Sequence, residues 1–161
     1  MKIGVVSDTH NHLGNVTRIV ELLNAARVDR VVHTGDITQA KTLEVFSRLE
    51  APLCGVFGNN DRERVSLGAA CAEYDFHFTD PPMRFEWSAR SITVVHDPLD
   101  IPADDQRGPG VVLHGHTHRQ VIERSPERIV FNPGECAGHV VGYNAIGVLD
   151  LATLETEILK F

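Results

Sequence analysis

Seven side chains of types that bind divalent metals occur in five short polar clusters, and each cluster directly follows an apolar run. They comprise two carboxylates, one side-chain amide and four imidazoles, without a thiolate. This mixture of hard and borderline donors suits divalent transition metals. A single octahedral ion takes about six donors including water, so seven protein donors with one shared carboxylate fit two ions better than one. The candidate metal-binding residues are Asp8, His10, Asp36, Asn59, His96, His116 and His118.

The spacing of the last two histidines is compatible with two arrangements. His116 and His118 are two residues apart, so on an extended strand their side chains would share a face. In a tight turn they would instead point toward different metals. The spacing alone leaves both arrangements open.

The apolar runs before the polar clusters predict the strands that must position them. Residues 2–7 form a run rich in β-branched side chains, which predicts a buried strand. Apolar residues at three- and four-residue steps from Leu13 to Ala26 predict a helix, and a strand pattern returns at 28–32. A second helix, with Thr38 as its expected N-cap, and a strand at 52–57 continue the alternation. Because the carboxyl ends of parallel strands meet at one edge of a sheet, we expect the clusters to form one site.

The second half of the chain predicts a further β layer. The pattern indicates a short helix within 62–75, paired strands at 83–88 and 90–95, and a strand at 110–113. Hairpins are expected at 120–131, turning at Ser125-Pro126, and at 145–159. The expected class is α/β with an added β layer.

Length and composition exclude several classes of protein. With 161 residues, we expect one domain spanning residues 1–161. Apolar residues at 42% and charged residues at 23% exclude disordered, collagen-like and coiled-coil chains. The net charge of −7 argues against a broad basic surface for nucleic acid or anionic lipid. An anionic substrate must therefore be held by local groups.

The cysteines and the N-terminus predict a cytoplasmic protein. The cysteine count is three, an odd number, with no CxxC pair, which argues against a disulfide framework. We expect these cysteines to act as small buried apolar residues. The first apolar run is far shorter than a signal-peptide core, and no apolar stretch approaches the roughly 20 residues of a membrane span.

Taken in order, the polar clusters are Asp8-x-His10, Gly35-Asp36, Gly58-Asn59-x-Asp61, His96 and Gly115-His116-x-His118. This series resembles the calcineurin-like metallophosphoesterase family from Met1 to about Asn132. The segment Asn132-Pro133-Gly134-Glu135-Cys136 and the short length resemble its small bacterial and archaeal phosphodiesterases of the YfcE-like group. The resemblance implies a four-layer α/β/β/α sandwich. It also implies that one metal is held by Asp8, His10, Asp36 and His118, and the other by Asp36, Asn59, His96 and His116.

The implied activity is hydrolysis of small phosphodiesters by a hydroxide that bridges two metal ions. Asp36, Asn59 and His96 are the expected catalytic residues, with Asp36 bridging the metals. The positive charge of two divalent ions exceeds the negative charge of the Asp8 and Asp36 carboxylates, so the pocket would be positive. A positive pocket favours a phosphate ester as substrate. Mn²⁺ is the first choice of metal, with Ni²⁺, Co²⁺, Fe and Zn²⁺ as alternatives. We expect no extended nucleic acid and no membrane as partner, and a homo-oligomer is left open. The alternative function is a scaffold on the same fold that binds partners and turns over little.

The sequence departs from the family pattern at two places. Asn60 stands where many members have a histidine able to protonate the leaving group, which predicts a preference for acidic leaving groups. Asp61 is expected to fix its loop. His96-Asp97-Pro98 replaces the usual His-Gly, and the prolines and glycines up to Gly110 predict a loop instead of a helix, where we expect substrate specificity. The acidic residues of that loop would either discourage strongly anionic substrates or be ordinary solvated loop charges, which is the more common case; they are Asp100, Asp104 and Asp105.

The remaining histidines are expected at the surface, in the core or in support of the site rather than as metal ligands. They are His12, His33, His77, His114 and His139.

Overall fold

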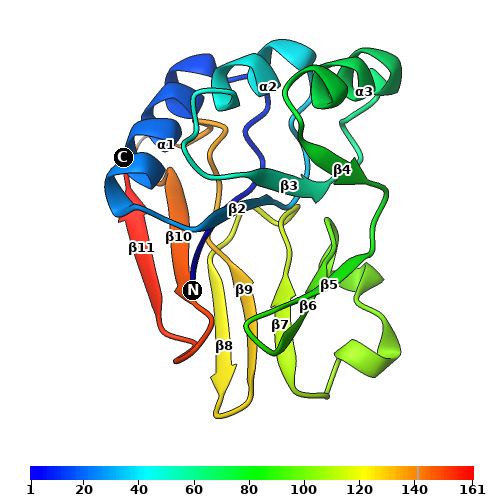
Figure 1. Ribbon diagram of the computed structural model, residues 1–161, viewed down its shortest axis with the longest axis vertical. Coiled ribbons are helices and arrows are strands. Elements are labelled where there is room, and N and C mark those ends of the chain that lie inside the picture. Colours follow the sequence, from blue (N-terminus) through cyan, green and yellow to red (C-terminus); the bar gives the residue numbers. More distant parts are fainter. Residues whose placement is uncertain (141) are drawn as a thin grey trace.

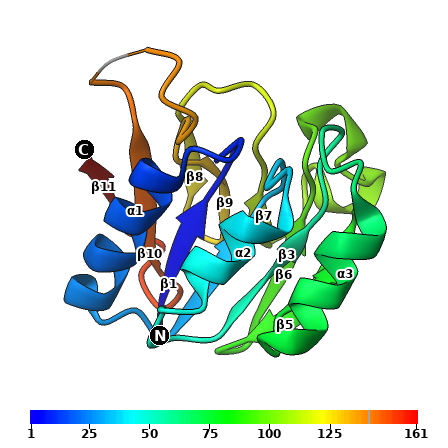
Figure 2. The same ribbon diagram turned by 90° about the horizontal axis from the view of Figure 1, so that it is seen from above.

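The computed structural model describes residues 1–140 and 142–161. Within these residues the chain forms two β-sheets and three α-helices, and the helices lie together on one side of the first sheet (Figure 1). In the view from above, α1, α2 and α3 lie side by side across that sheet (Figure 2). No helix of the described residues is long and apolar enough to span a membrane.

The first sheet has the strand order β11-β10-β1-β2-β3-β4 among the described residues. Its parallel half alternates with the helices as the sequence predicts, and β10 and β11 close it as the predicted antiparallel hairpin. The bounds are β1 Lys2–Val6, α1 Leu13–Ala26, β2 Arg30–His33, α2 Ala40–Phe46, β3 Leu53–Val56, α3 Arg64–Glu73, β4 His77–Thr79, β10 Ala145–Asp150 and β11 Thr156–Lys160.

The second sheet has the order β5-β6-β7-β9-β8, with a parallel centre flanked by two hairpins. All of its strands were predicted from the sequence. Their bounds are β5 Met83–Trp87, β6 Arg90–Val94, β7 Gly110–Leu113, β8 Val121–Ser125 and β9 Arg128–Asn132.

Two apolar cores separate three layers, namely the helices, the first sheet and the second sheet. The expected four-layer α/β/β/α sandwich therefore lacks its second α-helical layer in the described residues, because the chain between β6 and β7 forms only single 3₁₀ turns. On β1, Val6 packs toward the helices, whereas Ile3 and Val5 belong to the core between the two sheets. This division follows from the two-residue period of a strand, which sends alternate side chains to opposite faces. Gly4 also faces the helices, and a Cβ there would meet Leu23 of α1 at 2.5 Å. The buried β1 therefore positions its carboxyl end rigidly.

The segment after His96 forms two single turns of 3₁₀ helix, η1 Pro98–Asp100 and η2 Ala103–Asp105, so the prediction that no regular helix forms here is confirmed. Asp105 accepts hydrogen bonds from Arg84 (2.7 Å) and Thr93 (3.0 Å) on β5 and β6. This carboxylate fastens the segment to the second sheet. It is therefore not free to repel an anionic substrate, as the sequence analysis had suggested for this loop.

The structure differs from the sequence predictions at three places. Thr38 does not cap α2: the N-cap is Gln39, and Thr38 adopts a left-handed φ of 78° with its N–H donating to Asp61. Strand β4 was not predicted, because three residues are too few to establish a strand pattern, and they pair with β3 only through the tertiary fold. The second strand also begins two residues later than predicted, at Arg30.

Candidate metal centre

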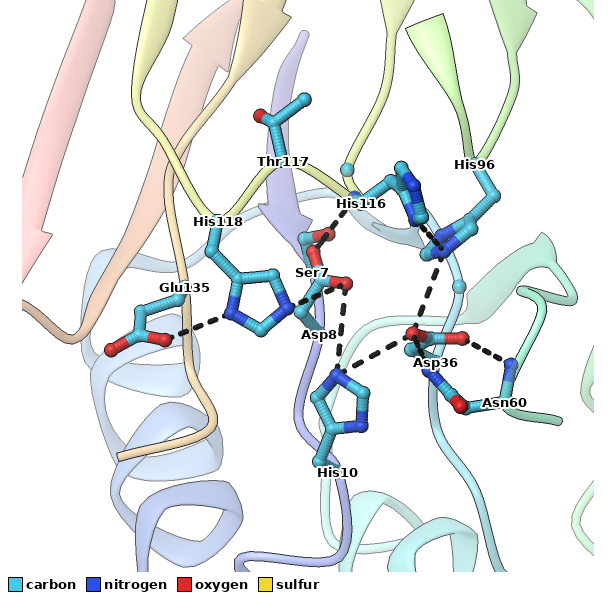
Figure 3. Close-up of polar contacts among 12 residues, drawn as sticks. Ser7, Asp8, His10, Asp36, Asn60, His96, His116, Thr117, His118 and Glu135 are labelled. Atoms are coloured by element: carbon cyan, nitrogen blue, oxygen red, sulfur yellow. Dashed lines mark hydrogen bonds and ion pairs between the residues drawn. The ribbon is translucent and has the colours of Figure 1, made fainter. Parts of the chain in front are cut away.

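All five polar clusters lie together at the carboxyl ends of parallel strands, as the sequence predicts. They follow β1, β2 and β3 of the first sheet and β6 and β7 of the second, so both sheets contribute (Figure 3). Most of the candidate donors have left-handed backbone, a conformation that non-glycine residues hold only where the surrounding structure enforces it. Their φ values are 52° for Asp8, 41° for His10, 61° for Asp36, 64° for His116 and 55° for His118.

One group of donor atoms gathers around Asp8. His118 Nε2 lies 3.5 Å and His10 Nε2 lies 3.9 Å from Asp8 Oδ1, and His10 Nε2 lies 3.4 Å from Asp36 Oδ2. The other carboxylate oxygen, Asp8 Oδ2, accepts hydrogen bonds from Ser7 Oγ and from the N–H of His116. These bonds leave Asp8 Oδ1 directed at the histidines.

A second group shares Asp36 with the first. His96 Nε2 lies 3.5 Å from Asp36 Oδ2, 2.9 Å from Asn59 Oδ1 and 3.2 Å from His116 Nδ1. Asn59 Oδ1 lies 3.1 Å from His116 Nδ1. The two groups together contain every donor predicted from the sequence, with Asp36 Oδ2 common to both.

The turn at 115–118 decides how its histidines point. Thr117 N–H donates to the carbonyl of Gly115, and both histidines have positive φ. His116 therefore joins the group around His96, whereas His118 joins the group around Asp8 (Figure 3). Of the two arrangements that the spacing allowed, the structure has the tight turn.

The polar atoms of the site fit metal ions. Asp8 Oδ1 and His10 Nε2 are buried and have no hydrogen-bond partner in the described part of the chain. A buried polar group without a partner is costly, and an ion between these atoms would supply one. For ligands at about 2.1 Å from an ion, neighbouring donors lie roughly 3.0–3.4 Å apart, close to the separations found in both groups.

The tautomer of His96 supports the same conclusion. His96 Nδ1 lies 2.9 Å from the carbonyl oxygen of Thr34, to which it donates. In the neutral imidazole, Nε2 then carries a lone pair that faces the oxygens of Asn59 and Asp36. Burial acts to lower the pKa of His96, but the contacts with Asp36, the Thr34 carbonyl and Asp8 together outweigh it and raise the pKa. The site thus favours positive charge between these atoms.

The two carboxylates of the site have different electrostatic environments. Burial raises the pKa of Asp8, against the hydrogen bond from Ser7. Burial also acts to raise the pKa of Asp36, but contacts with His96 and Asn60 lower it far below its ordinary value. Asn60 donates to Asp36 twice, from its N–H (2.9 Å) and from Nδ2 (2.8 Å). Asp36 is therefore held as a carboxylate in the centre of the site.

Asp61 supports the loops rather than contacting the donor atoms, as predicted. Its carboxylate accepts hydrogen bonds from the N–H groups of Asp36 (3.0 Å), Thr38 and Gly58 (2.7 Å). It thereby joins the loop after β2 to the loop after β3. Because these loops carry Asp36 and Asn59, Asp61 fixes their separation.

Two residues that were not predicted to bind metal lie beside the site, Glu135 and His139. Glu135 is buried, and its Oε2 accepts a hydrogen bond of 2.9 Å from His118 Nδ1. His139 stacks on His118 with ring centroids 5.3 Å apart, and its donor atom lies within 4.8 Å of those of His10 and His118. Glu135 lies beyond β9 with no apolar run directly before it, so only its place in the Asn-Pro-Gly segment could have drawn attention to it.

The other residues predicted to lie outside the site are mostly where expected, but Cys54 is only partly buried, unlike Cys71 and Cys136. His33 is fully buried, and burial lowers its pKa to about 3. Cys136 is fully buried and its Sγ donates to the carbonyl of Ala145. Burial raises the pKa of this thiol, so it does not behave as a nucleophile.

Comparisons with known proteins find relatives that match nearly the whole chain. Residues 1–154 match the model of the calcineurin-like phosphoesterase superfamily domain. The chain is 34% identical over 154 residues to phosphodiesterase MJ0936 of Methanocaldococcus jannaschii, covering 93% of each sequence. A solved structure described as a novel archaeal phosphodiesterase has a TM-score of 0.89 at 32% identity over the whole of both chains. That of YfcE, a phosphoesterase from E. coli, has a TM-score of 0.73 at 25% identity, covering 94% of this chain and 89% of that one.

Proposed function

Because the chain belongs to the calcineurin-like phosphoesterase superfamily, we propose that it is a metal-dependent phosphodiesterase that hydrolyses small phosphodiesters at a binuclear centre. The observation that carries this proposal is the pair of donor groups that share Asp36 Oδ2, together with the unpartnered Asp8 Oδ1 and His10 Nε2 in the described residues. The family implies divalent metal ions, and these donors suit them.

The two donor groups define the proposed ligand sets. Asp8, His10, Asp36 and His118 would hold one ion, and Asp36, Asn59, His96 and His116 would hold the other. When bound, the two ions would lower the pKa of a water bridging them and stabilise negative charge on the phosphoryl oxygens. Mn²⁺ is our first choice for a donor set of nitrogen and oxygen, and Ni²⁺, Co²⁺, Fe and Zn²⁺ also suit it.

The charges around the site favour a diester over a monoester. The donor set has only the carboxylates of Asp8 and Asp36, so two divalent ions would leave net positive charge for a phosphate group. At the rim, Asp97 Oδ2 lies 3.5 Å from His116 Nε2. This additional negative charge disfavours a doubly charged monoester more than a singly charged diester. The intact donor set also favours an enzyme over a scaffold on the same fold.

The test is hydrolysis by metal-stripped protein that has been refilled with Mn²⁺. We expect turnover of bis-p-nitrophenyl phosphate that requires the metal and exceeds turnover of p-nitrophenyl phosphate. Asp36→Asn should reduce the diester rate by more than the roughly 10–100-fold that loss of a supporting partner of a metal ligand costs. Asp104→Asn, a matched change at an exposed aspartate of η2, should have little effect.

Metal content and circular dichroism complete the experiment. The wild-type protein should take up two ions per chain, and all variants should retain the wild-type spectrum. If folded, fully loaded protein is inactive with each of several metals, the phosphodiesterase proposal is wrong and the scaffold function is favoured.

A further inference from the structure

A cavity of about 630 Å³ opens directly beside the candidate metal centre. His118 and Glu135 form its boundary with the centre. The rest of its wall comes from the turn after β7, from the segment that follows β9 and from β11. We call this cavity the arm pocket; the residues of its wall that matter below are Arg119, Glu135, Val140, Tyr143 and Lys160.

The arm pocket is held in a fixed position relative to the metal donors. Glu135 Oε2 accepts from His118 Nδ1 at 2.9 Å, and its other oxygen, Oε1, accepts from the N–H of Val140 at 3.0 Å. Gly138 N–H donates to Asn144 Oδ1 at 2.9 Å, and the carbonyl of Glu135 accepts from Ala145 N–H. One buried carboxylate therefore connects a candidate metal ligand to the wall of the pocket.

The wall of the arm pocket exposes apolar side chains. Val140 is 52% and Tyr143 is 70% exposed, although most large apolar side chains of the described residues are buried. Both line the arm pocket. Exposed apolar groups beside a few fixed polar groups are typical of a ligand-binding site. Tyr143 in particular offers an aromatic face to a ring.

The wall also carries unbalanced positive charge. Arg119 and Lys160 line the pocket, and neither forms an ion pair with any described residue. The one acidic residue of the wall, Glu135, already accepts hydrogen bonds at both of its oxygens. In a chain of net charge −7, two free cations at one cavity indicate an anionic ligand.

We propose that the arm pocket binds one ester arm of the phosphodiester, and that this arm carries an aromatic ring and a second anionic group, as a nucleoside monophosphate does. The inference rests on the proposed phosphodiesterase function. The scissile diester carries a single negative charge, which the metal centre accommodates. Arg119 and Lys160 therefore serve a further phosphate on the arm, while Tyr143 and Val140 contact its ring.

The first test compares two p-nitrophenyl esters that differ by one phosphate, thymidine 5′-(p-nitrophenyl phosphate) and its 3′-phosphorylated form, with Mn²⁺-loaded protein. We expect wild-type kcat/KM to favour the phosphorylated ester by about tenfold or more, the effect of one to two charge-assisted contacts. Arg119→Gln/Lys160→Gln should reduce this preference to near one. Arg48→Gln/Lys2→Gln, which changes the net charge equally at two exposed basic residues outside the pocket, should retain it.

The second test measures binding without catalysis. Adenosine 5′-monophosphate is titrated calorimetrically into metal-free protein in the presence of a chelator. We expect binding that weakens about tenfold in Arg119→Gln/Lys160→Gln and also in Tyr143→Ala, with Tyr143→Phe close to wild type. If Tyr143→Phe keeps wild-type binding while Tyr143→Ala loses it, the loss comes from the missing ring contact and not from a general disturbance of the fold.

The outcomes separate the two proposals. If bis-p-nitrophenyl phosphate is hydrolysed but wild-type protein shows no preference between the two thymidine esters, the phosphodiesterase function stands and the arm pocket is refuted. If bis-p-nitrophenyl phosphate is not hydrolysed, the phosphodiesterase function fails, and the calorimetric comparison alone decides whether the pocket binds a nucleotide. If wild type and all variants bind adenosine 5′-monophosphate equally, the arm pocket is not its binding site and the proposal is overturned.

Discussion

At the scale of single residues, Asn60 has a structural task in place of an acid–base one. It donates two hydrogen bonds to Asp36, which help to keep this central carboxylate ionised. An amide side chain cannot release a proton to a departing oxygen. The site therefore holds the Asp36 carboxylate firmly but has no general acid at this position.

A first prediction concerns the leaving group. General acid catalysis contributes typically about 10²–10⁴-fold, so without it the rate should depend strongly on how acidic the leaving alcohol is. We expect methyl p-nitrophenyl phosphate to be hydrolysed far faster than methyl phenyl phosphate, as measured by kcat with Mn²⁺-loaded protein. Similar rates for both esters would show that another group supplies the proton.

A second prediction concerns Glu135. A carboxylate that accepts from the far nitrogen of a metal-binding histidine orients the ring and raises its basicity. We expect Glu135→Gln to weaken metal binding and to reduce activity by about 10–100-fold. The measurement is a Co²⁺ titration followed by absorbance, together with diester turnover.

Glu127→Gln is the matched control, because Glu127 is an exposed glutamate in the β8–β9 turn. Glu127→Gln should bind Co²⁺ with the affinity of the wild-type protein. Identical Co²⁺ affinity in Glu135→Gln and Glu127→Gln would contradict the assigned role.

At the scale of elements, the loops at the strand ends are crowded to the point where a single added carbon is not tolerated. A Cβ on Gly115 would lie 2.8 Å from Thr34 Oγ1 and 2.9 Å from Asp8 Oδ2. A Cβ on Gly35 would lie 2.6 Å from His96 Nδ1. The glycines beside the donor residues thus allow the two sheets to approach each other at the site.

A third prediction follows from this crowding. Gly115→Ala should displace Asp8 and destabilise the protein by about 1–3 kcal/mol, the usual cost of overpacking. It should also weaken metal binding. Urea denaturation and the Co²⁺ titration measure the two effects.

The matched control is Gly68→Ala on α3, where an added Cβ would meet no atom within 4 Å. Alanine is a better helix former than glycine, so this variant should gain about 0.5–1 kcal/mol. If both variants changed stability in the same direction, the crowding at Gly115 would not be the cause.

At the scale of the whole molecule, stability should depend on pH through a histidine outside the site. His33 is fully buried, accepts from Gly35 N–H at Nδ1 (3.1 Å) and lies 3.3 Å from Thr9 Oγ1 at Nε2. Both contacts suit the neutral ring. Its folded pKa of about 3 is below the ordinary value of 6.5, so between these values the unfolded chain binds a proton that the folded chain does not.

The fourth prediction is that this histidine destabilises the folded state as the pH falls below 6.5. At pH 5.0, His33 should lower the free energy of unfolding by about 2 kcal/mol relative to pH 8. We expect the free energy of unfolding in urea, with chelator present, to fall less between pH 8 and pH 5 in His33→Gln than in wild type. Equal losses would show that other groups cause the acid sensitivity.

A single coincident transition by fluorescence and circular dichroism would also support the proposed single domain of residues 1–161.

Most of the fold and all of the proposed ligand set were predictable because their signals are local. Helix α1 follows from apolar residues at helical spacing, and its observed bounds equal the predicted ones. The donors after β1, β2 and β3 each stand directly after an apolar run. Parallel strands with helical connections must bring such residues to one edge.

The sequence by itself therefore determined the donor types, their order and the α/β alternation that gathers them. Only the tertiary structure decided that His116 and His118 face different donor groups, that Glu135 holds His118, and that Arg119, Tyr143 and Lys160 surround one cavity. The physical reason is that these relations join residues of separate elements across both sheets. Periodicity reports which face of its own element a side chain occupies, and only packing determines what that face meets.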